Sequence, residues 1–200
     1  GRVEVIRSQS TDWSELGAQL SAAPPDGKPL WFQKHMAHHL LPGVDRTWMR
    51  SALHCFLIRE PRQVVASYVR SRPEVLKRQP DGSVVVNLSA DELGFTQQLD
   101  LLDWAEKDLG QRCPVVDSAQ LLQRPADVLA SLCAELGVPW TPRMLSWAPG
   151  LRKTDGIWAE HWYANVRVST GFVPYKVRPV ALDEALQPIV NQLQVAYEAL

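Results

Sequence analysis

The fold class is decided by one segment, Phe56-Leu57-Ile58-Arg59-Glu60-Pro61-Arg62-Gln63-Val64-Val65-Ala66-Ser67-Tyr68. Its first part continues an apolar run of strand length, and the proline favours the first turn of a helix, where a missing N–H costs little. We therefore predict a buried strand over 53–58 and a helix over 61–72. Arg59 then stands at the carboxyl end of the strand. Ser67 lies about two turns into the helix, because one turn takes roughly 3.6 residues.

Arg59 and Ser67 are therefore candidate anion-binding residues. Ligands of open α/β sheets bind in the crevice outside the carboxyl ends of the strands. A guanidinium placed there suits a planar anion with several oxygens, such as phosphate. The alternative is an ordinary strand-turn-helix unit with an exposed arginine and a serine hydroxyl bonded to its own helix, and this short motif alone does not separate the two. Arg62, at the first turn of the helix, has a surface role as its default.

The rest of the chain predicts an alternation of strands and helices. Strand-like apolar runs occupy 30–34 and 113–117, and helical patterns occupy 11–20, 45–51, 90–109, 124–136 and 181–200. Alternation of this kind favours a parallel sheet. Prolines and a glycine interrupt the segment 72–90. We expect a loop excursion over 73–90 that is either mobile or faces the substrate, and that contains a small strand at 84–86.

Length and composition indicate an ordinary globular protein. The chain has 200 residues, 46% of them hydrophobic and 22% charged, which favours a single domain over 1–200. A net charge of −1 gives no support for nucleic-acid or membrane partners, so an anion site must be local. The three cysteines lack metal-ligand spacing, and no spanning segment or signal peptide is visible. These features favour a reduced, cytoplasmic setting without a metal.

Two further clusters are candidates for chemistry. Lys34-His35-Met36-Ala37-His38-His39 follows the run at 30–34, and a histidine at a strand end is a candidate general base. The alternatives are that these histidines begin the following segment or bind an adventitious metal. The loop Gly150 to Gly156 carries Arg152 and Lys153, two cations that either wrap over an anion or form a solvated basic loop.

Together these motifs resemble those of sulfotransferases that use 3′-phosphoadenosine 5′-phosphosulfate (PAPS). Arg59-Glu60-Pro61-Arg62 with Ser67-Tyr68 resembles the family's Arg-Asp-Pro-Arg-x-x-x-x-Ser-Tyr element, whose arginine and serine bind the 3′-phosphate. Arg152-Lys153 with Gly156 and Trp158 looks like the loop that closes over the same phosphate. The segment 34–42 is similar to the family's Lys-Thr-His-Leu-Pro-x-x-Leu-Leu-Pro, which places the catalytic base on His35. The overall pattern is most similar to small bacterial sulfotransferase-like proteins.

The resemblance implies a three-layer α/β/α fold of the P-loop nucleotide-binding kind, with a short parallel sheet. It also implies transfer of a sulfuryl group from PAPS to a hydroxyl or amine of a small-molecule acceptor, without a metal. His35 would accept the proton of the acceptor, and Lys34 would neutralise charge on the transferred group. The donor-binding residues would be Arg59, Ser67, Arg152 and Lys153.

The sequence also departs from the family pattern. Lys34 and His35 are adjacent where the family has Lys-x-His, so the role of base could fall on His38 or His39. The glycine after Arg-Lys is replaced by Thr154, and the family's Tyr-Glu-Asp-Leu, which helps to hold adenine, reads Ser-Ala-Gln-Leu at 118–121. The family's first strand and phosphate loop have no counterpart and are expected before residue 1. Two rivals stay open: a non-catalytic nucleotide-binding domain, and a kinase-like phosphoryl transferase on the same fold.

Overall fold

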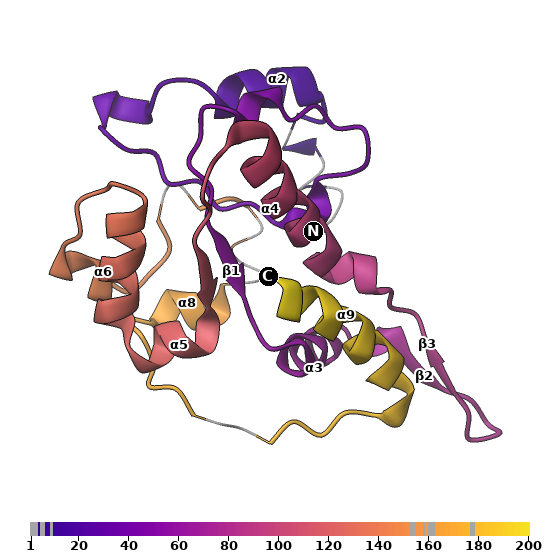
Figure 1. Cartoon of the computed structure of the whole chain (residues 1–200). Helices are drawn as coiled ribbons and strands as arrows, with labels where there is room; N and C mark the ends of the chain where they lie inside the picture. Colours follow the sequence, from indigo (N-terminus) through magenta and orange to yellow (C-terminus); the bar gives the residue numbers. More distant parts are fainter. Residues whose placement is uncertain are drawn as a thin grey trace. The chain divides into compact units, whose positions relative to one another are not determined.

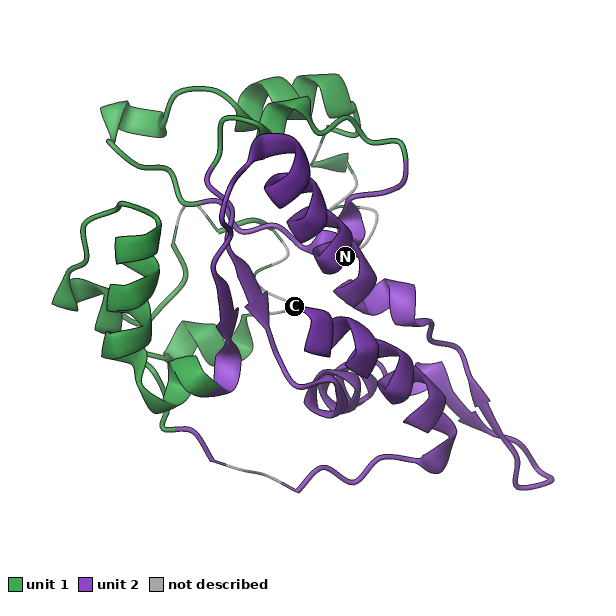
Figure 2. Ribbon diagram, viewed as in Figure 1, with its two compact units in different colours: residues 1–32, 43–52, 120–174 green, residues 33–42, 53–119, 175–200 purple. Residues whose placement is uncertain are grey.

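The computed structural model describes residues 4, 7–8, 10–152, 155–157, 159, 163–176 and 179–200. These residues form a mixed α/β structure (Figure 1). They fall into two compact units, each assembled from separate segments of the chain (Figure 2). Unit 1 comprises Gly1–Phe32, Gly43–Ala52 and Gln120–Pro174, and unit 2 comprises Gln33–Pro42, Leu53–Ala119 and Tyr175–Leu200. A single domain over 1–200 stays a prediction.

A short parallel sheet lies in unit 2. Strand β1 (Phe56–Ile58) pairs in parallel with β4 (Val115–Asp117), and Ile58 lies opposite Asp117. Both strands therefore end at the same edge of the sheet. The prediction of an α/β fold with a short parallel sheet is confirmed in this form.

Three helices build the core of unit 2. Helix α3 (Pro61–Ser71) follows β1, α4 (Phe95–Leu109) precedes β4, and α9 (Gln187–Ala199) contacts both α3 and α4. Their shared cluster buries Val65, Phe95, Leu186, Val190 and Leu193. A second cluster, which joins α4 to the two strands, contains Leu102, Ala105, Cys113, Phe56 and Val115. The helix predicted over 61–72 is thus confirmed almost to the residue.

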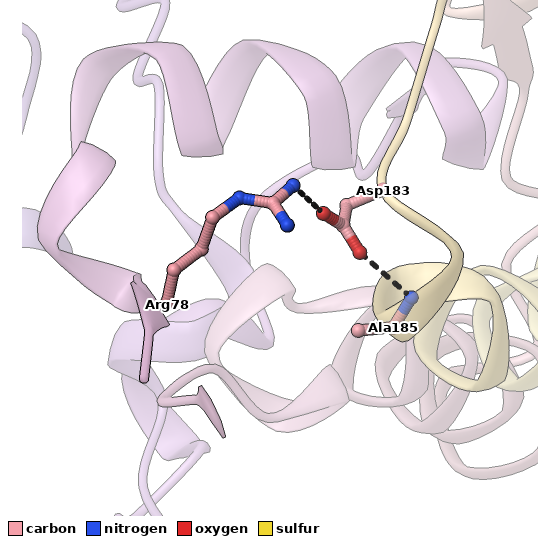
Figure 3. Close-up of polar contacts among 3 residues, drawn as sticks. All are labelled: Arg78, Asp183 and Ala185. Carbon is pink, nitrogen blue, oxygen red and sulfur yellow. Dashed lines mark hydrogen bonds and ion pairs between the residues drawn. The ribbon is translucent and has the colours of Figure 1, made fainter. Parts of the chain in front are cut away.

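The segment after α3 forms a β-hairpin. Strand β2 (Leu76–Arg78) pairs antiparallel with β3 (Val84–Val86), so the strand predicted at 84–86 is confirmed and its partner was missed. Figure 3 shows how the hairpin is attached: Arg78 Nη2 lies 2.6 Å from Asp183 Oδ2, while Asp183 Oδ1 accepts the N–H of Ala185. The Asp183 carboxylate therefore has two roles: one oxygen caps the 3₁₀ helix η7 (Glu184–Leu186), and the other pairs with Arg78 of the hairpin.

Unit 1 consists mainly of short helices. Helix α2 (Trp13–Leu20) begins at Asp12, whose side chain accepts from the backbone N–H of Ser14 and Glu15. The other helices are α6 (Pro125–Glu135) and α8 (Ala164–Val168), and α5 (Ser118–Gln123) joins β4 to α6. The remaining 3₁₀ helices of the described chain are η1 (Pro25–Gly27), η2 (Ala37–His39), η3 (Thr47–Met49), η4 (Pro73–Val75), η5 (Ala90–Leu93) and η6 (Pro142–Leu145).

Three predictions of secondary structure are wrong in part. The strand expected over 30–34 is not formed, and its side chains Leu30 and Phe32 are 54% and 78% exposed. The strand expected to be buried over 53–58 has only its last residue buried, and Leu57 is 57% exposed, because β4 is its only strand partner among the described residues. The helix expected over 90–109 is divided at Gly94, whose φ of +77° separates η5 from α4.

Candidate functional site

Arg59 lies directly after β1, at the carboxyl edge of the parallel sheet, and its side chain is exposed. The guanidinium donates from Nε and from Nη2 to Oε1 of Gln63, with both distances 3.1 Å. A guanidinium has five N–H donors. The others are without a partner among the described residues, so helix α3 orients Arg59 and leaves it able to bind an anion.

The amino end of α3 is closed by Glu60. Its carboxylate accepts from the backbone N–H of Arg62 at 3.0 Å and from that of Gln63 at 2.9 Å, and Pro61 has no N–H to satisfy. Free backbone N–H groups are what usually make a helix amino terminus an anion site. Because these groups are bonded within the chain, an anion at Arg59 would be held by side chains.

Ser67 lies on α3 and is exposed. Its hydroxyl bonds to no other described residue. The hydroxyl that bonds back to the helix is instead that of Ser71, which donates to the carbonyl oxygen of Ser67 at 3.0 Å. The alternative of a serine hydroxyl engaged with its own helix therefore does not apply to Ser67. Gln63 lies four residues before Ser67, so these two residues share one face of α3, and Arg59 reaches that face from the preceding strand end through its bonds to Gln63.

Arg62 is a structural residue, and the surface role taken as its default is wrong. Its Nε donates to the carbonyl oxygen of Val180 and its Nη1 donates to Oε1 of Gln187, both at 3.1 Å. These partners are 118 and 125 residues away in the sequence. The second arginine of the motif therefore ties α3 to the segment that leads into α9, and the first arginine faces solvent.

The neighbouring strand end carries a hydrogen-bonded pair that the sequence analysis did not foresee. The hydroxyl of Tyr197 on α9 donates to Asp117 Oδ2 at 2.8 Å, and Asp117 Oδ1 accepts the N–H of Ala119 at 2.7 Å. Burial and the bond to Asp117 raise the pKa of Tyr197 to about 12, so the phenol stays a neutral donor near pH 7. Both oxygens of Asp117 are engaged, which weakens the kinase-like rival, because that reaction needs an Asp or Ser to ligate Mg²⁺ and Asp117 is the aspartate at a strand end.

His35 has the properties of a neutral base near pH 7. Its Nε2 lies 3.0 Å from Oε1 of Gln33. A carbonyl oxygen only accepts, so this contact is a hydrogen bond in the tautomer that carries the proton on Nε2. The side chain of His35 is exposed at its surface, and part of it is buried. Partial burial is the main cause that lowers its pKa below 6.5, and the nearby His54 lowers the pKa further. Lys34 is exposed, and its Nζ lies 3.8 Å from the sulfur of Met36.

His38 and His39 stay open as alternatives for the base. Their rings meet edge to face, with centroids 4.4 Å apart. Burial and the neighbouring His39 lower the pKa of His38, while Glu92 opposes that shift. His38 packs against the start of α4, where a Cβ on Gly94 would lie 3.2 Å from the backbone nitrogen of His38.

The candidate base and the candidate phosphate ligand belong to opposite ends of β1. His54, which acts on the pKa of His35, precedes the strand and stacks edge to face on Trp104 at 5.8 Å. The effect of His54 on the pKa of His35 indicates that the segment containing His35 lies near this end of the strand. Arg59 follows the strand. His54 and Arg59 are five residues apart, so their backbone positions are separated by at most roughly 16 Å, the span of five residues of extended chain.

Arg152 belongs to unit 1, so it is described apart from Arg59. Its side chain is exposed, and its backbone N–H donates to Asp155 Oδ2 at 2.7 Å. Lys153, with Thr154 and Trp158 of the same motif, lies outside the described residues. The donor-binding role of Arg152 and Lys153 therefore stays a prediction.

Other features of the described chain lie away from these residues. A hollow of about 390 Å³ in unit 1 is lined by α2 and η3, including Trp13, Gly17 and Trp48, and contains none of the predicted site residues. Within the described ranges, no group of three or more His, Cys, Asp or Glu side chains is placed to hold a metal. None of the helices in those ranges is long and apolar enough to cross a membrane.

Comparison with known proteins identifies the family. A family model described as a sulfotransferase domain matches residues 1–194. The chain belongs to the sulfotransferase family. The resemblance inferred from the Arg59, Arg152 and His35 motifs is therefore confirmed at the level of the family, and no solved structure matches the chain significantly.

Two curated relatives come from Arabidopsis thaliana. Branched-chain-amino-acid aminotransferase-like protein 2 is 30% identical over 149 residues, which are 74% of this sulfotransferase chain and 24% of that protein. Branched-chain-amino-acid aminotransferase-like protein 1 is 30% identical over 147 residues, 73% of the chain and 24% of that protein. The chain thus spans about a quarter of each relative, and their names describe those longer proteins.

The sequence analysis missed several residues that surround the sulfotransferase motifs. Gln63 was detectable, since it lies one helical turn before Ser67 on the predicted helix and only four residues after Arg59. The pairing of Asp117 with Tyr197 gave no sequence signal, because 80 residues separate the two.

Proposed function

We propose that this sulfotransferase domain moves a sulfuryl group from PAPS to a hydroxyl or amine of a small-molecule acceptor. The observation that supports this most is the exposed guanidinium of Arg59, fixed at the carboxyl edge of the sheet by Gln63, with the Ser67 hydroxyl further along the same helix face. A guanidinium with a nearby hydroxyl can bind a phosphate monoester through several hydrogen bonds, and the monoester proposed here is the 3′-phosphate of the donor.

The finer architecture and setting are part of the same proposal. We place the short sheet in a three-layer α/β/α arrangement of the P-loop nucleotide-binding kind, in which ligands bind outside the carboxyl ends of the strands. Arg152 and Lys153 would add cations to the donor site. We propose a cytoplasmic protein that needs no metal for the transfer and does not have nucleic acid or membrane as a partner.

The transfer itself is an in-line displacement at sulfur. The acceptor oxygen or nitrogen forms a bond to sulfur, and the bond from sulfur to the bridging phosphate oxygen breaks. Its electron pair leaves with adenosine 3′,5′-bisphosphate. The acceptor's proton goes to a general base, for which the neutral His35 ring is suited because its lowered pKa keeps the ring unprotonated at pH 7. Lys34 would balance the negative charge of the moving group.

Calorimetric titration of the intact protein tests the donor site. Adenosine 3′,5′-bisphosphate should bind at least tenfold more tightly than ADP, which has two phosphates but none at the 3′ position. Arg59→Ala should remove that preference. Arg112→Ala is the matched control, since Arg112 is an exposed arginine before β4, at the other edge of the sheet. Equal affinity of the wild-type protein for the two nucleotides would refute the proposal.

A second experiment separates binding from chemistry. His35→Ala should leave binding of adenosine 3′,5′-bisphosphate unchanged and remove turnover of labelled PAPS in a screen of hydroxyl and amine acceptors. Retained turnover in this variant would move the role of base to His38 or His39. Nucleotide binding without turnover by any acceptor in the wild-type protein would favour the non-catalytic rival.

A further inference from the structure

The contact between Arg59 and Gln63 uses two donors of Arg59 and only one end of the Gln63 amide. Two donors of Arg59, Nε and Nη2, converge on the single oxygen Oε1 of Gln63, each at 3.1 Å. This contact fixes which end of the Gln63 amide faces the guanidinium. The amide nitrogen Nε2 takes no part in this contact, and its two N–H donors bond to no other described residue.

The surroundings of Gln63 make an additional donor valuable. The carboxylate of Glu60 occupies the N–H groups of Arg62 and of Gln63 itself, so the backbone at this helix end offers them to no ligand. The same carboxylate places a negative charge beside Arg59, which weakens the attraction of the site for an anion. A phosphate bound here therefore depends on side-chain donors, and Arg59 and Ser67 are two of them.

We infer that Gln63 is the third phosphate-binding side chain, acting through its Nε2 while its Oε1 positions Arg59. The inference rests on the proposed function and adds to it a ligand residue for the 3′-phosphate. The three donors are one charged and two neutral: Arg59 precedes α3 and bonds to Gln63, and Ser67 lies one helical turn after Gln63 on α3. The ligand class is a phosphate monoester, which has three outward oxygens and can accept from all three side chains at once.

Two substitutions of Gln63 separate its possible roles. Gln63→Met keeps the length of the side chain and a good helix propensity but removes both ends of the amide. It should weaken binding of adenosine 3′,5′-bisphosphate by about 3- to 10-fold. Gln63→Glu keeps an acceptor for Arg59 but replaces the N–H donors with a negative charge. It should weaken binding by about 10- to 100-fold. Neither variant should change the affinity for ADP.

A third variant distinguishes a ligand from a residue that only positions Arg59. In an Arg59→Lys background the positive charge is kept, but the paired guanidinium contact is gone. Adding Gln63→Met to this background should still weaken binding of adenosine 3′,5′-bisphosphate by about threefold if Nε2 contacts the phosphate. A purely positioning role predicts no further loss.

The control is Gln194→Met. Gln194 is half-buried in the middle of α9 and bonds within that helix to Glu198, so this variant matches the change in chemistry away from the site. Wild-type affinity in Gln63→Met, or no further loss in the Arg59→Lys background, would overturn the role of Gln63 while leaving the proposed function intact. A wild-type protein without preference for the 3′-phosphate would instead overturn both, so the two failures are distinguishable.

Discussion

Gly94 offers the sharpest test of how the histidine segment is placed. The residue is buried at the junction of η5 and α4, with φ +77°. A side chain in this left-handed region costs about 1–2 kcal/mol. A Cβ added there would also lie 3.2 Å from the backbone nitrogen of His38, which is tighter than an ordinary contact and is made to a group that cannot rotate away. Displacing that backbone costs roughly 1–2 kcal/mol more.

Gly94→Ala should therefore lower the free energy of unfolding by about 3 kcal/mol in total. For a chain of this size the loss corresponds to a decrease in Tm of about 6–12 °C. The assay is thermal unfolding followed by circular dichroism, together with the NMR chemical shifts of the His35 and His38 rings. Both rings should shift in Gly94→Ala, because the backbone of η2 has to move.

Gly110→Ala is the matched control at the other end of α4. Gly110 has φ +64°, but an added Cβ would meet nothing within 4 Å. It should show only the backbone cost of about 1–2 kcal/mol and leave the histidine shifts unchanged. Equal losses in the two variants, with unshifted histidine resonances in Gly94→Ala, would refute the placement of the His38 backbone against Gly94.

Three further predictions concern residues that tie unit 2 together. Tyr197→Phe should lose about 1–2 kcal/mol of stability through the lost bond to Asp117. Because folding raises the Tyr197 pKa from 10.0 to about 12, the wild type should lose more stability than this variant as pH rises through that range, measured by urea unfolding. His54→Ala should raise the pKa of His35 toward 6.5 in an NMR titration. The acid limb of a pH–activity profile should therefore move to higher pH. An unchanged His35 pKa would contradict the proximity of His35 and His54. Arg62→Met should lower stability by about 2 kcal/mol through its two lost long-range bonds, and an unchanged Tm would show that they do not hold α3 in place.

Local features of the fold were predictable from a few neighbouring residues. The start of α3 follows from Glu60 as a cap and Pro61 at the first turn, and the position of Arg59 after the strand follows from the apolar run before it. These signals act over one helical turn, so no knowledge of the rest of the chain is needed. The failure at 30–34 marks the limit of this reasoning, because an apolar run becomes a strand only where another strand supplies hydrogen bonds.

The break at Gly94 illustrates a second limit. Helical spacing of apolar residues continues on both sides of it, so periodicity alone predicts one helix over 90–109. The positive φ goes together with the close approach of η2, a contact between segments more than 50 residues apart in the sequence. Only a residue without a Cβ fits both conditions, and a glycine in the sequence does not say which partner requires it.

By itself, the sequence determined the family and the parallel pairing of short strands, and it predicted which residues bind an anion, since all of these are inferred from local motifs and their order. Only the tertiary structure decided what each residue does. The structure leaves the Arg59 side chain exposed to solvent, whereas Arg62 bonds to the segment that leads into α9, although the two arginines are three positions apart in one motif. It also joined Asp117 to Tyr197 and His35 to His54. The physical reason is that a side chain's role depends on which distant groups the packed helices bring within hydrogen-bonding or electrostatic range, and local propensity carries no information about them.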